Sequence, residues 1–142
     1  MKKKAIITVS SRQINEENND EDVEVVTPGN FYKKEDSYYA VYEETEISGM
    51  KGTTTTLKIE DNKLSLIRIG STSSKMEFDE KKENVSMYTT PYGTLQLKIK
   101  TSDLDVDVND YGGDVTVNYD LSIVGQVPVK TVLKININPN KN

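Results

Sequence analysis

The sequence contains no cysteine, no histidine and no tryptophan. Without cysteine and histidine the chain has no thiol nucleophile, no imidazole base, no Ser-His-Asp triad and no thiolate or imidazole ligand for zinc. Arginine is also scarce, with only Arg12 and Arg68 present. Any catalysis would have to use carboxylates, tyrosine or lysine, which excludes most common enzyme classes. The sequence therefore predicts no cofactor and no metal site.

Positive charge and long apolar runs are scarce as well. The chain has 18 basic and 23 acidic residues and a net charge of -5, which repels nucleic acid and anionic lipid. No stretch approaches the roughly 18 apolar residues of a membrane span, and the apolar run after Lys2 to Lys4 is too short for a signal peptide. We expect a soluble cytoplasmic protein with no nucleic acid and no membrane partner, and the lack of cysteine fits a reducing compartment.

What the sequence does contain is alternation of apolar and polar residues. The alternation is clearest from Val115 to Ile123 and from Leu104 to Val108. Because β-branched residues and tyrosine dominate these runs, they predict half-buried strands. The segment Asp110-Tyr111-Gly112-Gly113-Asp114 lies between them, and its glycines can take positive φ. The two runs therefore predict a β-hairpin.

The same pattern predicts eleven short strands and no helix along the whole chain. We expect them at residues 4–14, 23–33, 37–47, 53–60, 63–69, 74–78, 85–90, 94–101, 104–108, 114–124 and 128–138. A length of 142 residues and the lack of any linker indicate one domain over residues 1–142. The predicted fold is all-β, a single antiparallel closed β-barrel in which the last strand pairs with the first, because closure removes exposed edges.

Two polar segments are interpreted as solvent-exposed. Residues Asn15 to Asp22 are acidic and rich in asparagine, and they lack the glycine and the ligand order of an EF-hand, so we expect an exposed acidic loop and not a calcium site. The run Thr53 to Thr56 is interpreted as β-propensity at a solvated strand face, in preference to a surface that binds ice or phosphate.

An arginine and a glutamate are expected inside the barrel. If Leu64 and Leu66 face the core, the period of two turns Arg68 inward too. A buried guanidinium needs a nearby anion, and Glu44, on the same strand face as Tyr42, is the leading candidate. Two interpretations stay open: a structural ion pair or a rim arginine, and an anchor for an anion or carboxylate at the floor of a ligand cavity.

Tyrosines form a second inward-facing group. Tyr42, Tyr88 and Tyr119 fall on the predicted inner face, together with Met76 and Phe78. An apolar lining with a few hydroxyl groups suits a small amphipathic ligand. It also suits an ordinary packed core in which each hydroxyl finds a buried partner.

The order of these features resembles the YwiB-like family of uncharacterised bacterial proteins. The resemblance rests on Tyr42-x-Glu44, Leu66-Ile67-Arg68-x-Gly70, Met76-x-Phe78, Tyr88-x-Thr90-x-Tyr92-Gly93-x-Leu95-x-Leu97 and Val117-x-Tyr119-x-Leu121. It covers nearly the whole chain and implies a calycin, lipocalin-like β-barrel, a cytoplasmic bacterial protein and an unassigned function. The acidic loop at Asn15 to Asp22 and the regular hairpin around Tyr111 depart from the family pattern.

These observations lead to one main functional expectation and two alternatives. We expect a non-enzymatic module that binds a small amphipathic or anionic molecule, through Arg68, Glu44, Tyr42, Tyr88, Thr90 and Tyr119. The alternative is a structural or interaction protein with a filled core, acting through its outer face or as a homodimer. An enzyme using Arg68, Glu44 and a tyrosine has the least support, because no nucleophile stands beside a base.

Overall fold

The computed structural model describes residues 2–14, 21–45, 50–123 and 126–139. Within these residues the chain forms ten strands, and none of the described residues forms a helix that could cross a membrane. The strands are β1 (Lys3–Ile14), β2 (Glu21–Lys34), β3 (Ser37–Glu43), β4 (Thr53–Glu60), β5 (Lys63–Gly70), β6 (Ser73–Asp79), β7 (Glu83–Thr90), β8 (Gly93–Asn109), β9 (Gly112–Ile123) and β10 (Val129–Pro139).

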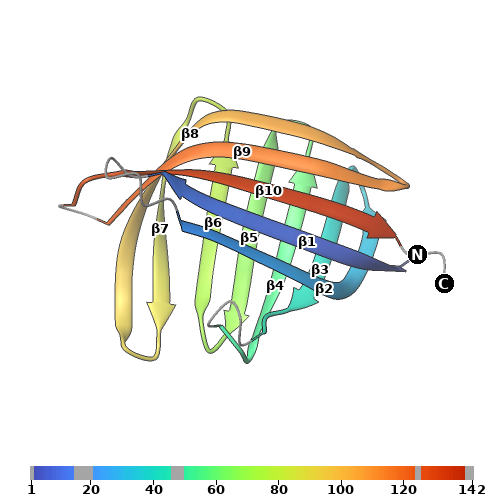
Figure 1. Cartoon of the computed structure of the whole chain (residues 1–142), viewed down its shortest axis with the longest axis horizontal. Helices are drawn as coiled ribbons and strands as arrows, with labels where there is room; N and C mark the ends of the chain where they lie inside the picture. The colour runs from blue at the N-terminus through green and yellow to red at the C-terminus, as the bar shows by residue number, and fades with distance from the viewer. Residues whose placement is uncertain (1, 15–20, 46–49, 124–125, 140–142) are drawn as a thin grey trace.

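The strands close into one antiparallel barrel in the order β1-β10-β9-β8-β7-β6-β5-β4-β3-β2. The first and last strands pair from Ala5 opposite Pro139 to Ile14 opposite Lys130. In Figure 1, β1, β2, β9 and β10 cross the front, while β4, β5 and β6 run steeply behind them. The predicted all-β closed barrel and the pairing of its first and last strands are confirmed.

The antiparallel order gives the barrel two distinct ends. Strands β1, β3, β5, β7 and β9 all finish at one end, where β2, β4, β6, β8 and β10 begin. We call it the open end, because a cavity lies beneath it. At the opposite, closed end, short turns at Glu35-Asp36, Asp61-Asn62 and Asp110-Tyr111 join the strands. The tight hairpin predicted at Asp61-Asn62 is confirmed.

Several predicted boundaries are wrong, and the strand expected at 37–47 already ends at Glu43. The strands expected at 94–101 and 104–108 are one long strand, β8, with a β-bulge between Thr101 and Asp103. The bulge accommodates the extra residue without ending the strand. The predicted acidic loop is too long, since Glu21 and Asp22 belong to β2, while residues 15–20 lie outside the described part of the chain.

The hairpin between β8 and β9 depends on glycine, as predicted. Gly112 and Gly113 have φ angles of 94° and 145°. A Cβ atom at Gly113 would lie 1.9 Å from the carbonyl oxygen of Asp107 on β8. Any other residue at this position would therefore face backbone strain and a steric clash.

Strands β6 and β7 are joined partly by side chains. Direct pairing is confined to two positions near the open end. Toward the closed end, Asn84 Nδ2 donates to the carbonyl of Glu77 at 3.1 Å, and Ser86 Oγ donates to the carbonyl of Lys75 at 2.5 Å. These side chains donate hydrogen bonds to β6 carbonyls, which in a regular β-ladder would accept from backbone N–H groups of the neighbouring strand.

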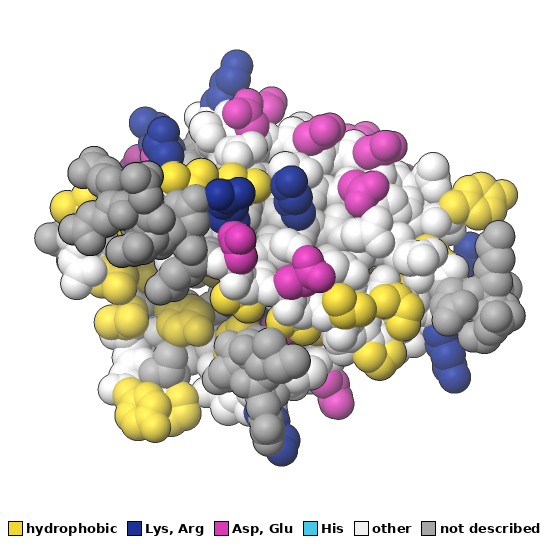
Figure 2. Space-filling model, viewed as in Figure 1, with side chains coloured by type: hydrophobic (Ala, Val, Ile, Leu, Met, Phe, Trp, Pro, Cys, Tyr) yellow, Lys and Arg dark blue, Asp and Glu magenta, His cyan; other side chains and the backbone are white. Residues whose placement is uncertain are grey.

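The core is densest toward the closed end. Its fully buried side chains include Ile7, Phe31, Leu57, Ile59, Leu64, Ile99, Val115, Val117, Ile135 and Ile137. Burying one such side chain contributes about 1.5–3 kcal/mol. On the outer surface in Figure 2, acidic and basic side chains are interspersed over the face made by the front strands. Alternation along each strand therefore separates an apolar interior from a charged exterior.

Candidate functional site

A cavity of about 390 Å³ lies inside the barrel beneath the open end. One wall, from β1, β2, β9 and β10, is mostly apolar and includes Val9, Val25, Leu121 and Leu133. The facing wall carries Tyr42, Glu44, Arg68 and Tyr88 beside Leu66 and Met76. A volume of this size falls in the lower part of the usual range for ligand pockets, about 300–1,000 Å³.

One polar residue from each of five neighbouring strands forms a row around the second wall. Strand register places Tyr42 opposite Thr55, Thr55 opposite Arg68, Arg68 opposite Ser74, and Ser74 opposite Tyr88. We call these five residues the polar row. Because directly opposite residues point to the same face of a sheet, all five belong to the inner face.

The next row toward the closed end is apolar on β3 to β6, while β7 carries the buried Ser86 two residues from Tyr88. The apolar residues are Ala40, Leu57, Leu66 and Met76, each two residues from a member of the polar row. Leu57 is fully buried, and the others are buried too. On these four strands the interior therefore changes from apolar to polar within one step of the strand period.

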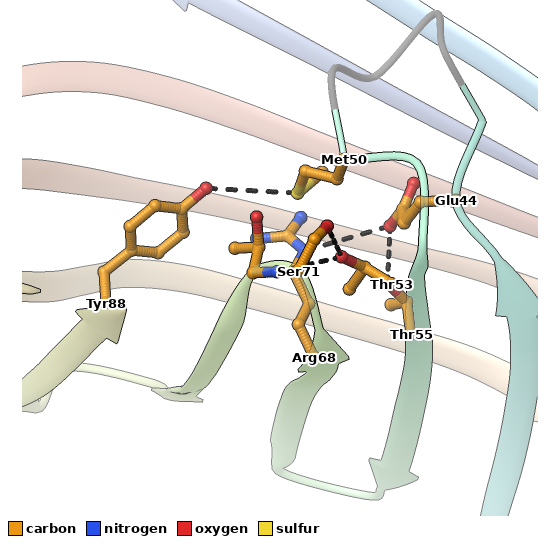
Figure 3. Close-up of polar contacts among 8 residues, drawn as sticks. Glu44, Met50, Thr53, Thr55, Arg68, Ser71 and Tyr88 are labelled. Atoms are coloured by element: carbon orange, nitrogen blue, oxygen red, sulfur yellow. Dashed lines mark hydrogen bonds and ion pairs between the residues drawn. The ribbon is translucent and has the colours of Figure 1, made fainter. Parts of the chain in front are cut away.

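Glu44 and Arg68 form an ion pair at the cavity wall (Figure 3). Arg68 Nε lies 3.8 Å from Glu44 Oε2, and the side chains are 17% and 3% exposed. Glu44 follows β3, where its backbone N–H donates to the carbonyl of Thr53 at 2.8 Å. Thr55 Oγ1 donates a 2.5 Å hydrogen bond to the same carboxylate oxygen, Oε2. The carboxylate is thus supported by both a charge and a hydroxyl donor.

Two buried donor groups in the polar row lack hydrogen-bond partners among the described residues. Arg68 Nε makes no hydrogen bond there, because 3.8 Å to Glu44 exceeds hydrogen-bonding distance. Ser74 Oγ is also buried without a partner in the described part of the chain. Ser74 lies directly opposite Arg68 on the neighbouring strand. Buried polar groups are usually satisfied, so these two neighbouring groups are exceptions in the polar row.

Burial keeps the phenols of Tyr119 and Tyr42 protonated at neutral pH. It raises the pKa of Tyr119 to about 12, against the opposing effect of the Arg68 charge. Burial also raises the pKa of Tyr42, and the Glu44 charge raises it further. Tyr88 is half-buried, and its hydroxyl donates to Met50 Sδ at 3.9 Å, a weak acceptor (Figure 3). The site therefore offers several phenol hydroxyls as hydrogen-bonding groups.

The structure brings together five of the six residues predicted for the site. Tyr42, Glu44, Arg68, Tyr88 and Tyr119 all line the cavity. The side chain of Thr90, at the end of β7, lies outside the described part of the structure.

The interpretation of Thr53 to Thr56 as a solvated face is wrong for two of the four residues. Thr53 and Thr55 are 2% and 0% exposed. Their inward orientation follows from the period of two, since Thr55 shares a face with Leu57 and Ile59. The polar composition of the run predicts that its side chains are exposed to solvent. Its alternation with the following leucine and isoleucine predicts instead that two of them are buried. The structure agrees with the alternation.

The cavity combines a few polar groups with mostly apolar walls. Among the described residues, no group of three or more acidic side chains could hold a metal ion. The polar groups are an ion pair and protonated hydroxyls, set in an otherwise apolar chamber. Such groups can orient and hydrogen-bond a molecule that enters the cavity.

Comparisons with known proteins agree with this fold. A family model described as "Domain of unknown function (DUF1934)" matches residues 7–135. The chain is 26% identical over 125 residues to the uncharacterized beta-barrel protein YwiB of Bacillus subtilis (strain 168), covering 87% of this chain and 86% of that protein. The crystal structure of YwiB matches with a TM-score of 0.87 at 21% identity, over 99% of this chain and 94% of that one, which shows the shared fold. The predicted YwiB-like resemblance is confirmed, and the chain belongs to the DUF1934 family.

Proposed function

We propose that this barrel is a non-enzymatic binding protein for a small amphipathic molecule. The observation that supports the proposal is the two-sided cavity, which has an apolar wall and, facing it, a wall that carries Glu44, Arg68 and Tyr88. The apolar part of the ligand would pack against Leu121 and Leu133, and its polar part would meet Arg68.

The difference in packing between the two ends supports the same proposal. Protein interiors rarely leave voids much larger than a water molecule. Here the closed end is filled with fully buried side chains, whereas about 390 Å³ stays open beneath the other end. A ligand that occupies this space would supply the packing contacts that the chamber walls lack. A uniformly filled core, the alternative that the sequence leaves open, describes the closed half alone.

Titration with neutral n-alkanols, followed by calorimetry, tests this function without involving charge. Affinity should rise with chain length until the chamber is full, because each buried methylene adds about 0.8 kcal/mol. Leu121→Trp, which fills the cavity from the apolar wall, should abolish binding. Ile69→Trp is the matched control, because Ile69 is 69% exposed.

Circular dichroism should show that both variants keep the β-barrel fold. The proposal fails if no alkanol binds the unmodified protein, or if folded Leu121→Trp binds alkanols as well as Ile69→Trp does.

A further inference from the structure

The polar row contains one positively charged group. Its members carry the Arg68 guanidinium and the hydroxyls of Tyr42, Thr55, Ser74 and Tyr88. The hydroxyls can donate or accept, whereas the guanidinium can only donate. The carboxylate beside the row, Glu44, already accepts the Thr55 hydroxyl and faces Arg68. A ligand that complements the guanidinium must therefore bring acceptor atoms.

The unsatisfied groups lie next to each other. Arg68 Nε and Ser74 Oγ both lack hydrogen-bond partners within the described residues, and the two residues are opposite one another on β5 and β6. Arg68 also lines the cavity, whereas Ser74 does not, so a ligand in the cavity would meet Arg68 and not Ser74. Tyr88, opposite Ser74 on β7, adds a hydroxyl whose present acceptor is a thioether sulfur.

The shape of the guanidinium favours a planar acceptor with two oxygens. Arginine presents five N–H donors in a rigid fork that matches a carboxylate in bidentate geometry. Glu44 does not fill this role, because its Oε2 stands 3.8 Å from Nε. Since Thr55 also supports the Glu44 charge, Arg68 can share its own charge with a second carboxylate.

We infer that the cavity selects amphipathic molecules that carry a carboxylate, and that Arg68 and Tyr88, which both line the cavity, bind that group. This inference rests on the proposed function and narrows its ligand class. The hydrocarbon part of the ligand lies along the apolar wall made by Val9, Leu121 and Leu133.

Calorimetry with decanoate and n-decanol tests the inference, because the two probes share a chain length and differ in the head group. At pH 7.5 and fixed ionic strength, decanoate should bind at least about tenfold more tightly than decanol, as expected for charge-assisted hydrogen bonds. Arg68→Lys keeps the positive charge beside Glu44 but removes the planar fork, and Tyr88→Phe removes one hydroxyl donor from the cavity wall. Each variant should reduce the ratio of the decanoate affinity to the decanol affinity.

Arg12→Met is the matched control. Arg12 is the only other arginine in the sequence, and its side chain is 56% exposed at the end of β1, where it pairs with Asp22. This substitution should leave the preference intact, which separates a local site from a general effect of net charge.

The outcomes separate the two proposals. Equal affinity for decanoate and decanol overturns the carboxylate site while leaving ligand binding supported. A preference that survives both Arg68→Lys and Tyr88→Phe also overturns the assigned site. If neither probe binds, the proposed function fails and the carboxylate site fails with it.

Discussion

The two halves of the barrel are built from the same strands but differ in the side chains that face the interior. Thr55 and Leu57 are neighbours on the inner face of β4, and Arg68 and Leu66 hold the same relation on β5. One member of each pair belongs to the polar row and the other to the apolar row, only two residues closer to the closed end. Alternation decides that a side chain faces inward, and here the position along the strand separates polar from apolar inner residues.

Specific polar contacts also hold the closed end of the barrel together. Tyr38 hydroxyl donates to Asp110 Oδ1 at 2.7 Å, and Lys3 Nζ donates to the carbonyl of Asp110 at 2.9 Å. The Tyr38 ring stacks on Phe31 with centroids 5.5 Å apart. Apolar packing and satisfied donors thus hold this end together, whereas the open half leaves both space and unsatisfied donors. We interpret the closed half as the source of stability and the open half as the site of binding.

The largest expected change in stability comes from a comparison of one leucine from each half. Leu64 is 0% exposed in the filled core, and Leu133 is 5% exposed but borders the cavity. Leu64→Ala should lower the free energy of unfolding by about 4 kcal/mol, because it creates a new void in packed surroundings. Leu133→Ala should cost about 2 kcal/mol, because part of its surface already faces empty space.

Urea unfolding at equilibrium measures both variants, and comparable m-values ensure that the midpoints can be compared. Equal losses of stability for Leu64→Ala and Leu133→Ala would remove the distinction between a filled and a hollow half.

Much of the fold is predictable from the sequence because its signal is local. Alternation of apolar and polar residues assigns the inner face of most strands, and the same alternation is sufficient to turn Arg68 and Glu44 inward. Glycine chemistry locates the turn before β9, since Gly112 and Gly113 need positive φ. These features depend on a few consecutive residues, so the sequence contains them directly.

Features that depend on register between strands are not predictable in this way. Ser74 is absent from the expected site residues, because its place beside Arg68 follows from how β5 and β6 pair. The bulge at Thr101 to Asp103 likewise reflects the fit of β8 against β9. The cavity itself depends on the combined volume of side chains from many strands, which no local pattern reports.

A smaller effect is expected at Thr55, which supports the Glu44 charge. Thr55→Val keeps the shape of the side chain and removes the 2.5 Å hydrogen bond to Glu44. Because hydrogen bonds to charged groups contribute about 1.5–3 kcal/mol, we expect a loss of roughly 2 kcal/mol in the free energy of unfolding.

Thr56→Val is the matched control on the same strand, since Thr56 points to the opposite face and is half-buried. It should change stability by less than about 0.5 kcal/mol. A Thr55→Val variant as stable as Thr56→Val would mean that the carboxylate does not depend on the hydroxyl.

The smallest expected effect concerns alkaline pH and again distinguishes the hollow half. Burial raises the pKa of Tyr119 from its ordinary value of 10.0 to about 12, so the folded protein keeps this proton over a range where the unfolded chain loses it. Below pH 10 the Tyr119 phenol is protonated in both the folded and the unfolded state, so it does not make the free energy of unfolding depend on pH. Between pH 10 and about 12 the folded state binds the extra proton, so stability falls as pH rises, by on the order of 1 kcal/mol per pH unit.

Tyr119→Phe removes this ionisation while keeping the ring that packs on Phe78, with centroids 4.7 Å apart. Below pH 10 the difference in unfolding free energy between Tyr119→Phe and the unmodified protein should be constant, and from pH 10 to 12 it should shift in favour of the variant. Tyr92→Phe, at a side chain 99% exposed, should follow the unmodified protein throughout. Parallel profiles for all three proteins would show that the Tyr119 phenol ionises as readily in the barrel as in the unfolded chain, and that the chamber wall does not exclude water from it.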